Sequence, residues 1–240
     1  MKVLLTRPEG KNHAMAVALE KQGIPYVITP LIKILPTFTS NSQDRFAHAD
    51  AIIFVSTNAV TFAKQLHSSP WPTDIPYFAV GQATQKALLA LGIQATAPKK
   101  GAPQTSEGVL ALPALASIKN KNILIVRGTG GRETLADTLK QRQAQVTYWE
   151  VYQRVPVELK ANQITNQWQI AKIDTIIVTS GEILSNLIKL VPNELFSWLQ
   201  TCHIIVPSAR VEQLAFQHGL VHVTNAKAAN ANAMISTLIT

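Results

Sequence analysis

The 240-residue sequence is poor in cysteine and has no long apolar run, and each shortage excludes a class of protein. The single cysteine, Cys202, cannot form an internal disulfide, so it suits a reducing compartment and is interpreted as a buried residue. No stretch approaches the ~18 apolar residues of a membrane span. The N-terminal segment has an apolar run of only three residues, ended by Arg7 and Pro8, which is not a secretion-signal pattern. We therefore expect a cytoplasmic protein.

Signatures of common catalytic sites are also missing. The six histidines form no cluster with metal-ligand spacing, and one cysteine cannot complete a zinc site. The G-x-S-x-G elbow of hydrolases is absent. An enzyme with this sequence therefore lacks an evident nucleophile, metal or cofactor, and its chemistry is limited to positioning a reactive substrate.

Acidic residues are the scarcer charge, with 14 Asp and Glu against 22 Lys and Arg and a formal net charge of +8. Such an excess is explained either by solubility alone or by an anionic ligand. The basic residues are scattered and no nucleic-acid-binding motif accompanies them. An acidic small molecule is therefore favoured over nucleic acid as the partner.

Six short apolar runs are each followed by a small or hydroxylated turn and a helical pattern. They are residues 2–10, 51–60, 76–84, 122–133, 174–183 and 202–210. Continuous Val, Ile and Leu runs indicate strands buried on both faces of a parallel sheet. The segments after them place apolar residues at helical spacing. The predicted class is α/β and doubly wound.

Two extended, proline-ended segments, 26–36 and 146–156, break this rhythm and are predicted to be connecting strands that pair. We expect two similar, flavodoxin-like parallel-sheet lobes. The first comprises residues 1–36 and 156–240, and the second, residues 37–147, is inserted into it. Lobes joined by two strands are expected to move and to close on a ligand. The alternative is one large sheet with two long edge strands.

The turns between strands and helices carry the candidate chemistry. Ligands of open parallel sheets bind beyond the carboxyl ends of the strands, where helix N-termini favour anions. Any one Ser, Thr or Asn there is explained as a helix cap. The arginines in or beside these turns, Arg7, Arg127, Arg132 and Arg210, are less easily explained in that way.

The segment ILIVRGTGGRETL (123–135) contains the most distinctive of these turns. Glu133 stands where a dinucleotide fingerprint needs its third glycine, and no Gly-Lys-Ser/Thr follows. The glycines permit positive φ and close approach, while Arg127 and Arg132 can fork onto a carboxylate or phosphate. The segment is predicted to bind an anion without being a nucleotide motif. Glu133 and Asp137 share one helix face, interpreted as solvated.

Taken together, these features resemble the uroporphyrinogen-III synthase family. The segments that carry the resemblance, in order along the chain, are LLTRP, PLIKI, FVSTNAV, AVGQAT, SEGVLALP, ILIVRGTGGRETLADTL, VYQR and VTSGEIL. They extend over essentially the whole chain. The resemblance implies two α/β lobes joined by a two-stranded ladder, with the site in the cleft.

The resemblance further implies a lyase of haem biosynthesis that converts hydroxymethylbilane to uroporphyrinogen III. This substrate is a linear tetrapyrrole with an acetate and a propionate on every ring. The reaction loses water and closes the macrocycle with inversion of ring D, and it needs no metal or organic cofactor. Unassisted closure yields isomer I, so the protein's task is orientation and protonation of one leaving hydroxyl. A monomer is the default expectation.

When the family's cleft motifs are matched to this sequence position by position, the resemblance implies a set of residues that bind substrate carboxylates. They are Arg7, Ser56, Thr57, Asn58, Gly81, Thr84, Arg127, Gly128, Gly131, Arg132, Thr179, Ser180, Ser208 and Arg210. The last turn departs from the family, because Pro207 stands where many members have a small residue.

The acid is assigned from the tyrosines near the second connector. Many family members place a tyrosine on the helix after the second connector, and NQITNQWQIAK (162–172) contains none. Tyr152 in VYQR is the nearest phenol and is the hypothesised acid, with a packing role as the alternative. Trp168 in the same helix is interpreted as a packing residue, with a place in the cleft as its alternative. The competing function is a two-lobed binding module for an acidic small molecule, without catalysis.

Overall fold

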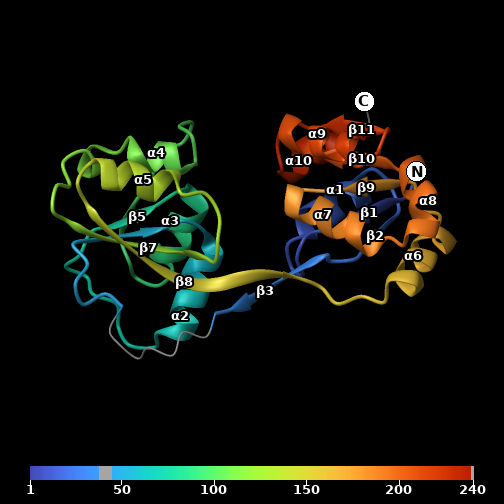
Figure 1. Ribbon diagram of the computed structural model, residues 1–240. Helices are drawn as coiled ribbons and strands as arrows, with labels where there is room; N and C mark the ends of the chain where they lie inside the picture. The colour runs from blue at the N-terminus through green and yellow to red at the C-terminus, as the bar shows by residue number, and fades with distance from the viewer. Residues whose placement is uncertain (38–44, 239–240) are drawn as a thin grey trace. The chain divides into compact units, whose positions relative to one another are not determined.

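The computed structural model describes residues 1–37 and 45–238. The chain divides into two compact units, Met1–Lys33 with Val155–Thr240, and Ile34–Arg154. Each unit is built on its own sheet (Figure 1). The predicted α/β class with one lobe inserted into the other is confirmed, and the alternative of one large sheet is wrong for the described residues.

The first unit has a five-stranded sheet in the order β11-β10-β9-β1-β2, and its paired strands run parallel. Numbered by their order along this unit, the strands follow the flavodoxin-like sequence 2-1-3-4-5. The strands are β1 (Val3–Leu5), β2 (Tyr26–Ile28), β9 (Thr175–Ile177), β10 (His203–Val206) and β11 (Val223–Asn225).

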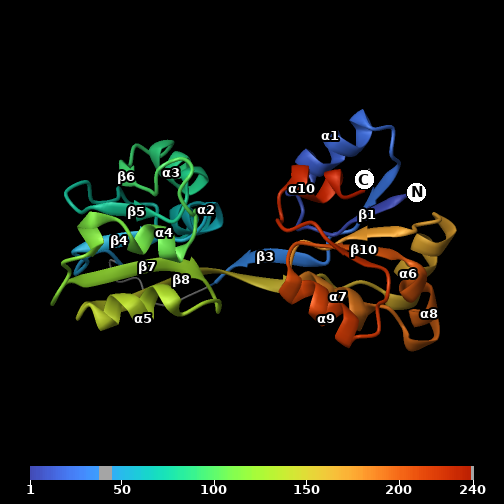
Figure 2. The ribbon, with the colours of Figure 1, turned by 90° about the horizontal axis from the view of Figure 1, so that it is seen from above.

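Helices cover both faces of this sheet (Figure 2). α1 (His13–Lys21) and α10 (Ala231–Ser236) pack on one face. The other face carries α6 (Ala161–Ile170), α7 (Gly181–Leu190), α8 (Phe196–Thr201) with the short helix Asn193–Leu195 before it, and α9 (Ala209–Gln217). The strands are buried on both sides, which is the reason their sequences are continuously apolar.

The inserted unit has a six-stranded sheet in the order β3-β8-β7-β4-β5-β6. The strands are β3 (Ile32–Pro36), β4 (Ala51–Phe54), β5 (Tyr77–Ala79), β6 (Ala95–Thr96), β7 (Asn122–Gly128) and β8 (Gln145–Pro156). From β4 onward the strands follow the doubly wound order 3-2-1-4-5. Both units are therefore doubly wound parallel-sheet lobes as predicted, and they differ in strand order.

The helices of the inserted unit also form two layers. α2 (Thr57–Leu66) and α3 (Gln82–Leu89) contribute to the core on one face. α4 (Ser106–Leu110) and α5 (Thr134–Gln141) contribute to the core on the other, and the short helix Pro113–Leu115 follows α4. No described helix in either unit is both long and apolar enough to cross a membrane.

The segment 26–36, predicted as one connecting strand, is divided between the two sheets. β2 pairs with β1 in the first sheet, whereas β3 lies beside β8 in the second. The break falls at Pro30, which has no N–H to continue the ladder. The segment 146–156 belongs to the single 12-residue strand β8, and β3 and β8 are neighbours as predicted.

Asp50 joins the amino ends of β4 and β7. Its Oδ2 accepts the Asn122 main-chain N–H at 2.7 Å, and its Oδ1 faces Lys121 Nζ at 3.2 Å. The main-chain hydrogen bond from Asn122, followed by that from Lys121, holds the pKa of Asp50 below its ordinary value. Asp174 holds the corresponding place in the first unit, where it accepts the Lys2 N–H at 2.9 Å.

Replacing Asp50 with Asn is expected to destabilise the protein near neutral pH and to make little difference in acid. A carboxyl with a lowered folded pKa contributes its full stability above the unfolded pKa, and that contribution is lost as pH falls through the folded pKa. Urea unfolding of wild type and Asp50→Asn at about pH 7 and about pH 3 measures the difference. The exposed Asp137→Asn is the control. A stability difference that persists in acid would contradict this account.

Candidate active site

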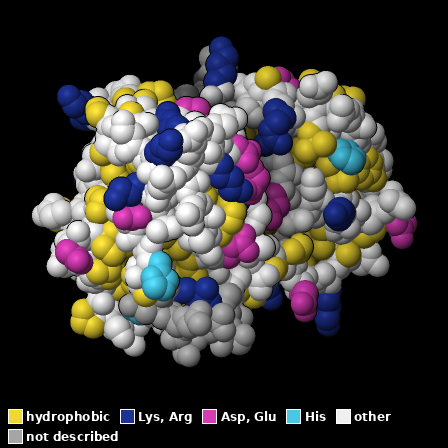
Figure 3. Space-filling view, turned by 60° about the vertical axis from the view of Figure 1, so that its left-hand side comes forward, with side chains coloured by type: hydrophobic (Ala, Val, Ile, Leu, Met, Phe, Trp, Pro, Cys, Tyr) yellow, Lys and Arg dark blue, Asp and Glu magenta, His cyan; other side chains and the backbone are white. Residues whose placement is uncertain are grey.

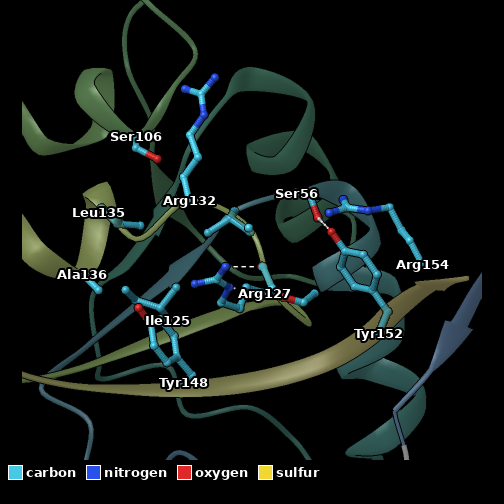
Figure 4. Close-up of a pocket in the computed structure, with 14 residues that line it drawn as sticks. Ser56, Ser106, Ile125, Arg127, Arg132, Leu135, Ala136, Tyr148, Tyr152 and Arg154 are labelled. Carbon is cyan, nitrogen blue, oxygen red and sulfur yellow. Dashed lines mark hydrogen bonds between the residues drawn. The ribbon is translucent and has the colours of Figure 1, made fainter. Parts of the chain in front are cut away.

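The carboxyl ends of β4 and β7 lie side by side in the inserted unit. The helices that follow them, α2 and α5, go to opposite faces of the sheet, so this is the topological switch point where ligands of such sheets bind. A pocket of about 290 Å³ opens there (Figure 4). It is lined by Val55, Ser56, Ser106, Ile125, Arg127, Gly128, Gly130, Gly131, Arg132, Leu135, Ala136, Tyr148, Tyr152 and Arg154.

A β-bulge shapes the floor of this pocket. Arg127 pairs with Glu150, but Gly128 pairs with Tyr152, so Val151 is an extra residue in β8. The bulge brings the Tyr152 ring so close to Gly128 that a Cβ there would lie 2.5 Å from it. The same ring also stacks on Phe62 at 5.7 Å between centroids. Tyr152 is 5% exposed, and its ring is held rigidly.

The Tyr152 hydroxyl lies 3.2 Å from Ser56 Oγ. Ser56 is the N-cap of α2, and its Oγ accepts the Ala59 N–H at 3.1 Å. Because that contact uses a lone pair, the Ser56 hydroxyl hydrogen remains available to the phenol oxygen. The residue is therefore a helix cap and a pocket residue at once. Thr57 and Asn58, the first residues of α2, are half-buried and do not line the pocket.

Arg127 is buried in the wall of the pocket, with 7% of its side chain exposed. Nε donates to Gly128 O at 3.2 Å, Nη1 meets Glu133 Oε1 at 2.9 Å, and Nη2 donates to Gly130 O. The guanidinium also lies over the Tyr148 ring, 4.8 Å from its centroid. All three nitrogens of Arg127 are thus engaged inside the protein.

Glu133 completes this arrangement. Its Oε2 accepts the Tyr148 hydroxyl, and the hydrogen bonds from Tyr148 and then Arg127 lower the pKa of Glu133. Burial and the hydrogen bond to Glu133 raise the pKa of Tyr148 to about 12. Glu133 is therefore ionised and Tyr148 neutral at physiological pH. Glu133 and Asp137 are both exposed, as the solvated-face interpretation predicts, but Glu133 also binds Arg127 and Tyr148.

The remaining arginines of the pocket, Arg132 and Arg154, are exposed. Figure 4 shows Arg154 beside Ser56 and the Tyr152 hydroxyl, whereas Arg132 extends from the glycine turn. Among the described residues that line the pocket, none is acidic. The pocket therefore offers positive charge and hydroxyl groups to an anion. On the face of the molecule drawn in Figure 3, Lys and Arg are interspersed with Asp and Glu.

Gly81 and Thr84 belong to a different pocket, of about 380 Å³, at the start of α3. There the Gln104 side chain caps the helix, because its Oε1 accepts the Gln82 N–H at 2.7 Å. Thr84 is 5% exposed. Gln104 is a residue that sequence reasoning missed, since it lies 22 residues along the chain from the amide that it binds.

The other predicted residues lie in the first unit. Ser180 caps α7 by accepting the Ile183 N–H at 3.2 Å, with Thr179 before it at the end of β9. Arg7 is half-buried and donates to Lys11 O at 3.3 Å and Ala229 O at 3.2 Å, and burial lowers its pKa.

The turn that leads into α9 lies close to α7. Arg210 Nη1 lies 3.5 Å from the position of a Cβ on Gly181, the first residue of α7. Ser208, after Pro207, is the N-cap of α9 and makes no side-chain capping hydrogen bond.

Two further interpretations from the sequence agree with the structure. Trp168 is 1% exposed in the core of the first unit and donates from Nε1 to Thr29 Oγ1 at 3.1 Å. Cys202 is buried, and burial raises the pKa of its thiol to about 12. No group of three or more described His, Cys, Asp or Glu residues is placed to hold a metal ion.

The chain is similar to known proteins over its whole length. The family model described as uroporphyrinogen-III synthase HemD matches residues 13–236. The uroporphyrinogen-III synthase of Escherichia coli K12 is 33% identical over 99% of this chain and 100% of that protein. The enzyme of the same name from Salmonella typhimurium LT2 is 34% identical with the same coverage.

Solved structures show the same fold at much lower identity. The uroporphyrinogen-III synthetase of Helicobacter pylori 26695 has a TM-score of 0.70 and 16% identity, covering 99% of this chain and 98% of that one. A mutant uroporphyrinogen III synthase of Thermus thermophilus has a TM-score of 0.62 and 14% identity, covering 100% and 97%. These likenesses concern the fold alone.

Proposed function

Because the chain belongs to the uroporphyrinogen-III synthase family, we propose that it converts hydroxymethylbilane to uroporphyrinogen III in haem biosynthesis. The reaction is a cyclising dehydration with inversion of ring D, and the enzyme is a lyase. The observation that carries the proposal is the family match over residues 13–236. The bacterial relatives and the single buried cysteine support a cytoplasmic enzyme, and we take the monomer as the working form.

The substrate is a polycarboxylate, and the pocket of the inserted unit has the chemistry to bind part of it. Arg132 and Arg154 offer guanidinium groups beside Ser56 and the glycine turn. Charge-assisted hydrogen bonds of this kind are among the stronger ones in proteins. The other proposed carboxylate ligands are Arg7, Thr57, Asn58, Gly81, Thr84, Arg127, Gly128, Gly131, Thr179, Ser180, Ser208 and Arg210.

Tyr152 is the proposed proton donor. Its phenol protonates the terminal hydroxyl of the substrate, which leaves as water and generates an azafulvene. The Ser56 hydroxyl, 3.2 Å away, stabilises the developing phenolate by donating to it. The substituted α-carbon of ring D then attacks to form a spiro intermediate, which fragments and recloses at the other α-carbon.

The isomer ratio tests the function directly. Purified protein is supplied with freshly made hydroxymethylbilane, and the products are oxidised to porphyrins and separated by chromatography. We expect predominantly isomer III with no added metal or cofactor. Isomer I alone, at the spontaneous rate, would reject the synthase function and favour a two-lobed binding module for acidic small molecules.

A further inference from the structure

An arginine in such a turn can bind the substrate directly, or it can position the main chain that binds it. The contacts of Arg127 indicate the second role. Three of the five N–H groups of Arg127 are already used inside the protein: Nε donates to Gly128 O, Nη1 to Glu133 and Nη2 to Gly130 O. The guanidinium is also enclosed by Tyr148 and has little exposed surface. Arg127 therefore holds the glycine turn from the wall of the pocket that it lines (Figure 4).

Its effect on the turn follows from peptide geometry. In a planar trans peptide, the C=O of one residue and the N–H of the next point in opposite directions. Since Gly130 O faces the guanidinium, the Gly131 N–H points away from it. The φ values of Gly130 and Gly131, +71° and +108°, are ones that glycine adopts readily. Arg127 thus orients the Gly131 N–H, whereas the Thr129 and Gly130 N–H groups donate to Tyr152 O and Glu150 Oε1.

Glu133 holds Arg127 in this position. One carboxylate oxygen binds Nη1 and the other accepts the Tyr148 hydroxyl, so the carboxylate is fixed on both sides. Glu133 also stands at the N-cap of α5, where a carboxylate ordinarily accepts the first helix amides, yet it makes no capping hydrogen bond. Its negative charge is directed to Arg127, and the amino end of α5 is left without a side-chain cap.

We propose that Glu133 is a positioning residue for substrate binding: through Arg127 it orients the Gly131 amide of the 128–132 turn toward a substrate carboxylate. This inference rests on the proposed function. For removal of the Glu133 charge, it predicts a change in substrate binding opposite in sign to the one expected from charge repulsion alone. Glu133 is an anion close to a site for a polyanion, so removing its charge without any positioning effect would strengthen substrate binding. Loss of positioning weakens it.

The sign of the change in KM therefore tests the proposal. We would measure kcat and KM for isomer III formation with wild type, Glu133→Gln and Asp137→Asn, and check folding by circular dichroism and thermal unfolding. Asp137→Asn is the matched control, because it removes one negative charge from an exposed position four residues further along the chain. We expect KM to rise roughly tenfold in Glu133→Gln, since small displacements of binding groups are costly, and to stay the same or fall in the control.

An unchanged or lower KM in a folded Glu133→Gln protein would overturn the proposal. If that variant does not fold, KM of Tyr148→Phe tests the proposal instead. This substitution keeps the charges of Glu133 and Arg127 and removes only the hydroxyl that holds the second carboxylate oxygen. A smaller rise in KM supports the proposal there, and no rise overturns it. Wild-type protein that forms only isomer I would instead reject the function on which the proposal rests.

Discussion

Replacing Tyr152 with phenylalanine is expected to lower kcat for isomer III formation roughly a hundredfold, with the fold retained. The ring keeps its contacts with Gly128 and Phe62, since only the hydroxyl is removed. The loss follows from the proposed role of that hydroxyl as the acid that assists departure of the substrate's leaving group. Steady-state rates at saturating hydroxymethylbilane, with isomers separated by chromatography, measure the effect.

Tyr77→Phe is the matched control for this experiment. Tyr77 lies in the same unit, and its hydroxyl donates to Pro72 O at 2.9 Å, so the control also loses one phenol hydrogen bond. Each substitution is expected to cost about 1 kcal/mol of stability. Only Tyr152→Phe is expected to lose activity. Full turnover in Tyr152→Phe would remove the hydroxyl from the mechanism and leave Tyr152 as a packing residue of the bulge.

Replacing Gly128 with alanine is expected to destabilise the protein by about 1–3 kcal/mol, the usual cost of overpacking. The added Cβ would lie 2.5 Å from the Tyr152 ring, which is also packed against Phe62. We also expect turnover to fall, since the ring that carries the proposed acid is displaced. Urea unfolding and isomer III rates measure the two effects.

Gly181→Ala provides the comparison for Gly128→Ala. A Cβ at Gly181 meets its nearest neighbour at an ordinary 3.5 Å, and this residue begins α7, so its substitution is expected to be neutral or slightly stabilising. A double variant, Gly128→Ala with Tyr152→Leu, makes room for the added methyl group. Its cost is expected to be smaller than the sum of the two single costs. If the two stability costs were strictly additive, contact with the Tyr152 ring would not be the cause of the destabilisation by Gly128→Ala.

The β-bulge, which defines this part of the site, is not visible in the sequence of either strand. β7 is continuously apolar over Ile123–Val126 and β8 mixes apolar and polar residues, and their register depends on packing between segments about twenty residues apart. For the same reason the sequence does not show that Gly128, a proposed anion-turn glycine, is in close contact with Tyr152.

The sequence by itself determined the six strand–turn–helix units, the class of fold and the position of the glycine–arginine turn at a strand's carboxyl end. These follow from local properties: β-branched apolar runs, helical spacing, and Ser56 and Ser180 as caps. The tertiary structure determined which residues each side chain contacts. Glu133 reaches Tyr148 on the neighbouring strand, and Gln104 caps a helix far from it in sequence. Such pairings depend on strand order and register, which local residue patterns do not encode.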